Sequence, residues 1–322
     1  MAGRHLKDLI VAYQSRDDLA FRRATQAIID EEEAKKHTAL ARDLRRMLAA
    51  AGDRVSVDAA PLPEPPRDRD SGVALVDVHP PGQVTFGELV FPEQLQRAMT
   101  QLSDEVALWG DLDKAGVPRR NRILLYGPPG CGKTSAAAAF ATELGLPLAV
   151  TRVDSLMSSY LGETAANLRA LFDFARAVPC VLLLDEFDSV GKLRADPTDH
   201  GELRRVVNSV LQLIETYSGP SFVVAATNSP DILDTALWRR FDEVLGVPLP
   251  TVEQLHRLLV AQLPEVNAGE LKDAAERLGG LPHAAAAAAI HATRRSAIRQ
   301  RRRPQPVDLD AGVVEVVNRP WA

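Results

Sequence analysis

The apolar and polar positions divide the chain into helical ends and a mixed middle part. In residues 1–51, apolar side chains recur at helical spacing, which predicts an N-terminal helical unit. From 73 to 250, short apolar runs alternate with helical patterns, as is typical of an α/β domain with a parallel sheet. Residues 251–322 carry helical patterns only. We therefore expect a small all-α domain, a lid, to close the chain.

A proline-rich segment, residues 52–72, separates the first helices from the rest. Pro61, Pro63, Pro65 and Pro66 stand there among charged side chains, with little apolar content. Proline fixes the backbone angle φ and removes a hydrogen-bond donor, so such a segment does not form a helix or a central strand. We interpret it as a linker.

The periodicities also place individual elements within the α/β and lid parts. The predicted strands are residues 123–126, 148–151, 180–184 and 222–226, with 244–247 as a possible fifth. The predicted helices are residues 91–102, 135–144, 252–263, 270–278 and 284–303.

The first of these strands runs directly into a glycine-rich turn, Gly127-Pro-Pro-Gly-Cys-Gly-Lys-Thr134, and then into a helix. The turn matches the pattern G-x-x-x-x-G-K-S/T in the strand–loop–helix context that a phosphate-binding loop requires. Its small residues let backbone N–H groups curl around a phosphate, and the helix start adds a positive dipole end. Lys133 can reach the β- and γ-phosphates, and the Thr134 hydroxyl can ligate Mg²⁺. The alternative is a Gly-Pro turn that binds nothing.

The predicted nucleotide-binding residues are Gly127, Pro128, Pro129, Gly130, Cys131, Gly132, Lys133, Thr134 and Ser135.

A second apolar run, Val181-Leu-Leu-Leu-Asp-Glu186, ends in an acidic pair. The tip of a buried strand beside a phosphate loop is where a nucleoside triphosphatase needs a carboxylate for its metal. Asp185 would hold Mg²⁺, and Glu186 would orient and deprotonate the attacking water. A buried strand with a solvated acidic end is the alternative.

Polar residues also follow the later strands. Asn228 at the end of residues 222–226 could hold the attacking water or touch the γ-phosphate, but Asn228-Ser-Pro is also a good turn sequence. The adjacent Arg239 and Arg240 are either surface charges or groups that offset charge developing on a γ-phosphate. Sequence spacing alone does not decide between these readings.

The overall composition excludes several classes of protein. A net charge of −5 implies no whole-chain attraction to nucleic acid or to an anionic membrane. No apolar run approaches the roughly 20 residues of a membrane span, and no signal-peptide pattern opens the chain. Two cysteines, Cys131 and Cys180, form no disulfide framework, so we expect a cytoplasmic protein with reduced thiols. The basic cluster 294–303 lacks interleaved aromatic residues, which favours a solvated helix end over nucleic-acid binding.

Taken together and in this order, these motifs resemble the AAA family of ring-forming ATPases, in its classical form found in FtsH, katanin and spastin. The resemblance covers roughly residues 86–297 and implies a P-loop NTPase fold, the AAA+ core, that uses ATP and Mg²⁺. It assigns Lys133 and Thr134 to Walker A, and Asp185 and Glu186 to Walker B. Asn228 would be sensor 1. Arg239 and Arg240 would be arginine fingers acting on the nucleotide of a neighbouring subunit, which implies a homo-oligomeric ring, by resemblance a hexamer.

The resemblance extends to the substrate. Ser158-Ser-Tyr-Leu-Gly-Glu163 is similar to the family's first pore loop, in which Tyr160 and Leu161 would grip an extended polypeptide. A core tyrosine is the alternative. The N-terminal segment looks like that of small bacterial AAA ATPases that work beside a subtilisin-like protease in phage defence.

The lid departs from the family pattern. Relatives usually carry Gly-Ala-Asp at a helix start, whereas this chain has Leu278-Gly-Gly-Leu-Pro-His-Ala284, so Gly280–Ala284 is our candidate position for lid contacts with adenine.

The motifs predict an ATPase that remodels, unfolds or threads a protein. Two other functions stay open from the sequence alone. One is a DNA-linked ATPase such as a loader or transposition helper, which would need basic pore residues. The other is a nucleotide-gated scaffold that recruits a partner and threads nothing.

Overall fold

The computed structural model describes residues 64–68, 71–82, 84–151, 161–188, 202–230 and 235–321, without the side chains at 161–163, 202–207 and 235–236. The chain separates into two compact units, residues 1–61 and 62–322. The predicted N-terminal helical unit and Tyr160 lie outside the described residues, and everything below concerns the second unit. The predicted domain boundaries at 51, 72 and 250 stay predictions.

A six-stranded sheet forms the centre of the α/β part, in the order β1-β3-β4-β5-β2-β6. The strands are β1 (Val76–His79), β2 (Arg122–Tyr126), β3 (Leu148–Thr151), β4 (Val181–Leu184), β5 (Phe222–Thr227) and β6 (Glu243–Gly246). Strands β2 to β6 pair in parallel, and all five lie where the sequence predicts them. Strands β2, β4 and β5 are almost wholly buried, which explains their continuous apolar runs.

The predicted parallel sheet is confirmed, and it carries one antiparallel strand at its edge. Strand β1, which the sequence analysis did not predict, pairs with β3 in the antiparallel direction, with Val76 opposite Thr151. Its sequence Val-Asp-Val-His contains too few apolar residues for a buried strand, and only its first residue is buried. An antiparallel strand at the edge of a parallel sheet is a common arrangement because one face of an edge strand can meet water.

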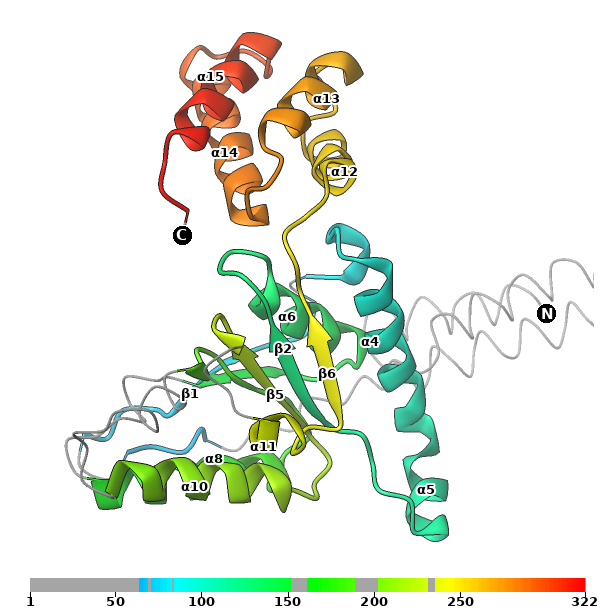
Figure 1. Cartoon of the computed structure of the whole chain (residues 1–322), viewed down its shortest axis with the longest axis vertical. Coiled ribbons are helices and arrows are strands. Elements are labelled where there is room, and N and C mark those ends of the chain that lie inside the picture. The colour runs from blue at the N-terminus through cyan, green and yellow to red at the C-terminus, as the bar shows by residue number, and fades with distance from the viewer. Residues whose placement is uncertain are drawn as a thin grey trace, which may run out of the picture. The chain divides into compact units, whose positions relative to one another are not determined.

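Helices cover both faces of the sheet (Figure 1). On one face, α8 (Leu161–Ala177) and α10 (Glu202–Glu215) pack against a core that includes Phe172. On the other face lie α4 (Glu93–Glu105) and α6 (Lys133–Glu143), around Phe140 and Phe222. Shorter helices are α5 (Trp109–Ala115), α11 (Thr235–Trp238) and the 3-10 turns Phe86–Glu88 and Val106–Leu108.

The lid is a separate four-helix core. It consists of α12 (Val252–Gln262), α13 (Ala268–Arg277), α14 (His283–Arg299) and α15 (Pro306–Val317). The predicted helix 284–303 is four residues too long, and α15 was not predicted. The chain turns away from α14 at Arg301, whose φ is 52°, and Arg302 then forms an ion pair with Asp308 in the first turn of α15.

The described end of the proline-rich linker is folded onto the α/β part. Asp68 accepts hydrogen bonds from the backbone N–H and hydroxyl of Ser71, at 2.7 and 2.8 Å. Its other carboxylate oxygen accepts from Asn167 of α8, at 2.7 Å, and both side chains are buried. Buried polar groups require hydrogen-bond partners, and Asp68 finds them in Ser71 and Asn167. These hydrogen bonds fix the shape of the linker before residue 72.

None of the described helices combines the length and apolar character needed to cross a bilayer.

The buried Asp308 carboxylate should make the lid sensitive to acid. It accepts hydrogen bonds from Ser296 Oγ at 2.6 Å and from Gln305 N at 3.0 Å, besides its ion pair with Arg302. The Arg302 guanidinium is the main cause that lowers the pKa of Asp308 to about 2. A carboxyl group in the unfolded chain titrates near ~3.9, so this stabilisation is complete above that pH and is lost as the pH falls toward 2.

We predict that Asp308→Asn lowers the lid's stability at neutral pH, because Arg302 loses its charged partner. The deficit relative to the parental protein should shrink as the pH falls from about 5 to about 2. Thermal unfolding followed by circular dichroism across that range measures it. Asp310→Asn is the control, since Asp310 is 64% exposed in its pair with Arg277. An equal, pH-independent effect of both variants would contradict the prediction.

Candidate functional site

The strand order brings the predicted site residues to one edge of the sheet. Strand β5 lies between β4 and β2 and is parallel to both, so the carboxyl ends of the three strands are neighbours. The glycine-rich loop follows β2, Asp185 follows β4 and Asn228 follows β5. In open α/β sheets, ligands bind outside these carboxyl ends.

Close backbone packing fixes the glycine-rich loop. Gly127 N donates to Thr227 O at 3.3 Å, and a Cβ atom added at Gly127 would lie 2.1 Å from Val247 O. Gly130 and Gly132 have φ of 70° and 96°, in the left-handed region that favours glycine. The three glycines are therefore required by the path of the loop, as the motif predicts.

Lys133 is held inside this loop. Its Nζ donates to the carbonyls of Gly127 at 2.7 Å and Pro128 at 2.9 Å, and the residue is only 7% exposed. Burial is the main cause that lowers the pKa of Lys133, while nearby acidic groups act in the opposite direction. The carbonyl contacts orient the ammonium group along the loop, where a phosphate would add a stronger partner.

The two predicted metal ligands meet directly. Thr134 Oγ1 donates to Asp185 Oδ2 at 2.8 Å, although 51 positions separate the residues in sequence. The other Asp185 oxygen accepts from the backbone N–H of Glu186 at 2.9 Å. A hydroxyl and a carboxylate are oxygen ligands of the kind that Mg²⁺ binds, so this pair fits the ion.

Glu186 has an unusual backbone. Its φ is 51°, which is rare outside glycine and costs on the order of 1–3 kcal/mol. The next residue, Phe187, is 2% exposed, and its N–H donates to Ala226 O at 2.8 Å. The turn at Glu186 thus buries Phe187 in the core while the carboxylate of Glu186 stays exposed beside Asp185.

A cavity of about 530 Å³ unites these groups. Its walls come from residues 88–91, the loop 129–135, the acidic pair, Asn228 and the lid. Its volume lies in the range of small-molecule sites. The predicted residues that line it are Pro129, Gly130, Cys131, Gly132, Lys133, Thr134, Ser135, Asp185, Glu186 and Asn228. The cationic, N–H-rich loop and the oxygen ligands fit a nucleoside triphosphate with Mg²⁺.

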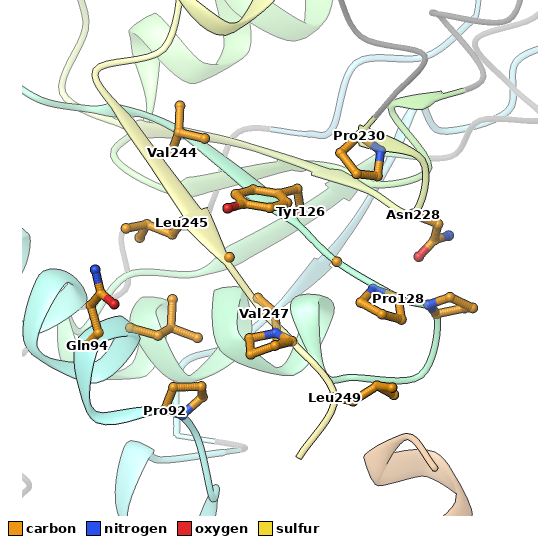
Figure 2. Close-up of a pocket in the computed structure, with 15 residues that line it drawn as sticks. Pro92, Gln94, Tyr126, Pro128, Asn228, Pro230, Val244, Leu245, Val247 and Leu249 are labelled. Atoms are coloured by element: carbon orange, nitrogen blue, oxygen red, sulfur yellow. The ribbon is translucent and has the colours of Figure 1, made fainter. Parts of the chain in front are cut away.

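A larger cavity, of about 930 Å³, lies between α4, β6 and the same loop (Figure 2). Pro129 and Asn228 line both cavities, but its other walls are prolines, aliphatic side chains, Tyr126 and Gln94. None of its described lining residues carries a charge, so it does not offer a site for phosphate.

The structure does not bring the two arginines into the cavity. They precede β6, and Asp242 N donates to Arg122 O at the start of β2, whereas the loop follows the end of β2. Arg240 Nε lies 3.7 Å from Glu215 Oε2, and Arg239 is exposed. The length of β2 alone is about 13 Å.

Two further predicted residues cannot be placed in the site. Tyr160 lies outside the described residues, and Leu161 begins α8 without a described side chain.

Sequence reasoning included His283 in the candidate lid segment Gly280–Ala284 but gave it no role of its own. Its imidazole lines the cavity, and Nε2 lies 2.9 Å from Val90 O. The departure from the lid signature at Leu278–Ala284 marked the place, but no spacing rule indicated that a histidine would join the lid to residues 88–91.

The fold and the cavity define a P-loop α/β nucleotide-binding protein, and comparison with known proteins gives its family. The model of the ATPase family associated with various cellular activities (AAA) matches residues 123–249. An uncharacterized AAA family ATPase, y4kL of Sinorhizobium fredii, is 41% identical over 265 residues, which are 82% of this chain and 79% of the relative. The chain belongs to the AAA family and is an ATPase; members of the family typically form oligomers.

More distant relatives share only the module. A putative cell division cycle ATPase of Plasmodium falciparum is 40% identical over 49% of this chain, and the peroxisomal ATPase pex6 of Schizosaccharomyces pombe is 40% identical over 50%. The matches cover 14% and 18% of those longer proteins. The crystal structure of the FIGL-1 AAA domain superposes with a TM-score of 0.62 at 23% identity, over 76% of this chain and 87% of the other. It supports the fold alone.

Proposed function

We propose that the chain hydrolyses ATP with Mg²⁺ in the 530 Å³ cavity, using the residues that the motifs predict. The observation that carries the proposal is the 2.8 Å hydrogen bond between Thr134 and Asp185, because it brings together two proposed metal ligands, one at the start of α6 and one after β4, beside Lys133. Thr134 and Asp185 would hold Mg²⁺, which would supply positive charge against the charge that develops on the phosphates. Lys133 would exchange its loop carbonyls for phosphate oxygens.

Glu186 is the proposed general base. Its carboxylate is exposed at the mouth of the site, and its backbone N–H donates to Asp185. This hydrogen bond fixes the position of the proposed base relative to the proposed metal ligand. Asn228 lines the same cavity and would hold the attacking water by its amide.

The active form is proposed to be a homo-oligomeric ring, with six subunits by family resemblance. The support is the position of Arg240 near the amino-terminal edge of the sheet, from which it does not reach the cavity of its own subunit. In a head-to-tail ring, that edge of one subunit can face the cavity of the next. Loss of the γ-phosphate would then release the contact and move the subunits relative to each other.

The proposed substrate is a protein that the ring remodels, unfolds or threads, with Tyr160 and Leu161 as pore residues and the cytoplasm as the compartment. A subtilisin-like protease acting in phage defence is the proposed partner. These points rest on the sequence resemblance.

We predict that Glu186→Gln keeps ATP affinity, lowers turnover at least about 100-fold and locks the oligomer in its ATP form, because the amide cannot take a proton. Steady-state hydrolysis, nucleotide binding and gel filtration with ATP measure the three effects. Glu276→Gln, an exposed residue of α13, is the matched control. Parental turnover in Glu186→Gln would refute Glu186 as the base.

A mixing experiment tests catalysis between subunits. We expect Lys133→Ala, which cannot hold ATP, and the double variant Arg239→Ala/Arg240→Ala to be inactive separately. Mixed in equal amounts, they should recover about a quarter of parental turnover, because one interface in four joins an intact loop to intact arginines. If oligomers mix without recovery, or if the arginine variant works as a monomer, catalysis between subunits is wrong.

The substrate role of Tyr160 can be tested with a chemically unfolded model protein. We expect that protein to stimulate ATP turnover in the parental ring and in Tyr160→Phe, which keeps the aromatic grip, but not in Tyr160→Ala. Equal stimulation of all three would argue against threading. Stimulation by DNA instead of protein, measured at varied salt, would favour the DNA-linked alternative.

A further inference from the structure

The first turn of α14 contacts the phosphate loop directly. Helix α14 spans His283–Arg299 and has no side-chain cap at its N-terminus, so its first N–H groups need other partners. One of them, Ala284 N, donates to Gly130 O in the phosphate loop at 3.0 Å. The lid helix is therefore capped by the loop itself.

This contact depends on the absence of a side chain at Gly130. A Cβ atom added there would lie 2.9 Å from the Cβ of Ala284, and the φ of 70° also disfavours other residues. The lid and the loop are therefore in direct backbone contact at this position. A change in the position of one must shift the other.

His283 adds a polar contact on a different segment. Its Nε2 lies 2.9 Å from Val90 O, and its ring packs edge-on against Phe91 with centroids 6.4 Å apart. A carbonyl only accepts, so the tautomer with hydrogen on Nε2 is the one that fits. Burial is the main cause that lowers the pKa of His283, which favours the neutral ring; contacts with the backbone of Val90 and Cys131 act in the opposite direction.

Cys131 lies at the same contact between the phosphate loop and the first turn of α14. Cys131 follows Gly130 in the loop and is fully buried. Burial raises the pKa of Cys131, while the charge of Lys133 and then the backbone of His283 act against this rise. Residues 283 and 284 thus contact Gly130, Cys131 and Val90, which form two walls of the cavity. We call these contacts the latch.

We propose that His283 is a positioning residue for ATP hydrolysis: through the latch, it fastens the lid to the phosphate loop and holds the loop in its binding shape. A loop that binds phosphate turns its N–H groups inward and its carbonyls outward. The latch holds one of those outward carbonyls, at Gly130, while His283 ties the helix start to Val90. The inference rests on the proposal that this loop holds ATP.

The test compares His283→Asn with His283→Gln. The glutamine amide can place its nitrogen near the position of Nε2 and donate to Val90 O, whereas the asparagine amide is too short. His291→Asn is the matched control, because His291 lies exposed on the same helix.

The first measurement needs no nucleotide. Without ATP, we expect a thiol reagent to label Cys131 at least about three times faster in His283→Asn than in the parental protein, His283→Gln or His291→Asn, because the lid then opens more often. Mass spectrometry separates the labelling of Cys131 from that of Cys180. Burial raises the pKa of Cys180 to about 11, so labelling of Cys180 should stay slow in every variant. Equal labelling of Cys131 in all four proteins would overturn the latch.

The second measurement concerns ATP. We expect His283→Asn to raise the KM for ATP about two- to tenfold, the effect of one hydrogen bond, with kcat within a factor of two. His283→Gln should restore KM. A fall in kcat with unchanged KM, or no rescue by glutamine, would refute the positioning role. If no variant and no parental protein bound ATP, the proposed function would fail while the labelling result still stood.

A third measurement covers the case in which His283→Asn does not fold. Hydrogen exchange of the amides at residues 283–286 in the parental protein should slow when ATP and Mg²⁺ are added, because nucleotide and latch favour the same loop shape. Exchange that is unchanged at saturating nucleotide would contradict the inference.

Discussion

The pairing of β5 with β2 and β4 is the constraint on which the site depends. Strands in a sheet lie roughly 4.8 Å apart, so groups that follow adjacent strands are held within reach of one another. Thr134 and Asp185 follow β2 and β4, which lie on either side of β5, and their side chains meet in a hydrogen bond across two strand spacings; Asn228 follows β5 between them. A change in strand order would separate the loop from the acidic pair, even with every catalytic residue present.

Much of the fold was predictable because its main elements have strong local signals. The strands β2 to β6 are short apolar runs, and the phosphate loop has its own pattern of glycines. Strand β1 was missed because only two of its four residues, Val76 and Val78, are apolar, so it contains no continuous apolar run. The end of α14 was misplaced because arginines favour a helix, whereas the chain turns at Arg301, whose φ is 52°, shortly before Pro304.

The features of the candidate site also divide into those that local motifs predict and those that depend on tertiary contacts. Lys133, Thr134, Asp185, Glu186 and Asn228 were predicted from motifs, and the structure places all five around one cavity, although their catalytic roles stay predictions. His283 lies within the candidate lid segment Gly280–Ala284, but its contact was not predicted because its partner is the backbone carbonyl of Val90, nearly two hundred positions away. A backbone acceptor leaves no mark in the sequence. The positive φ of Glu186 is likewise invisible there, since it results from the burial of Phe187.

The close approach of Gly127 to Val247 has a mechanical consequence. Val247 leads into the lid, and its N–H donates to Tyr126 O at 2.8 Å, so the lid is joined to the loop at this point as well as at Gly130 and Ala284. A lid that is held at these two contacts can rotate only about the line that joins them. If the contact between Gly130 and Ala284 opens, the contact at Val247 alone restrains the lid. The same thermal energy then moves the far end of the lid over a larger distance.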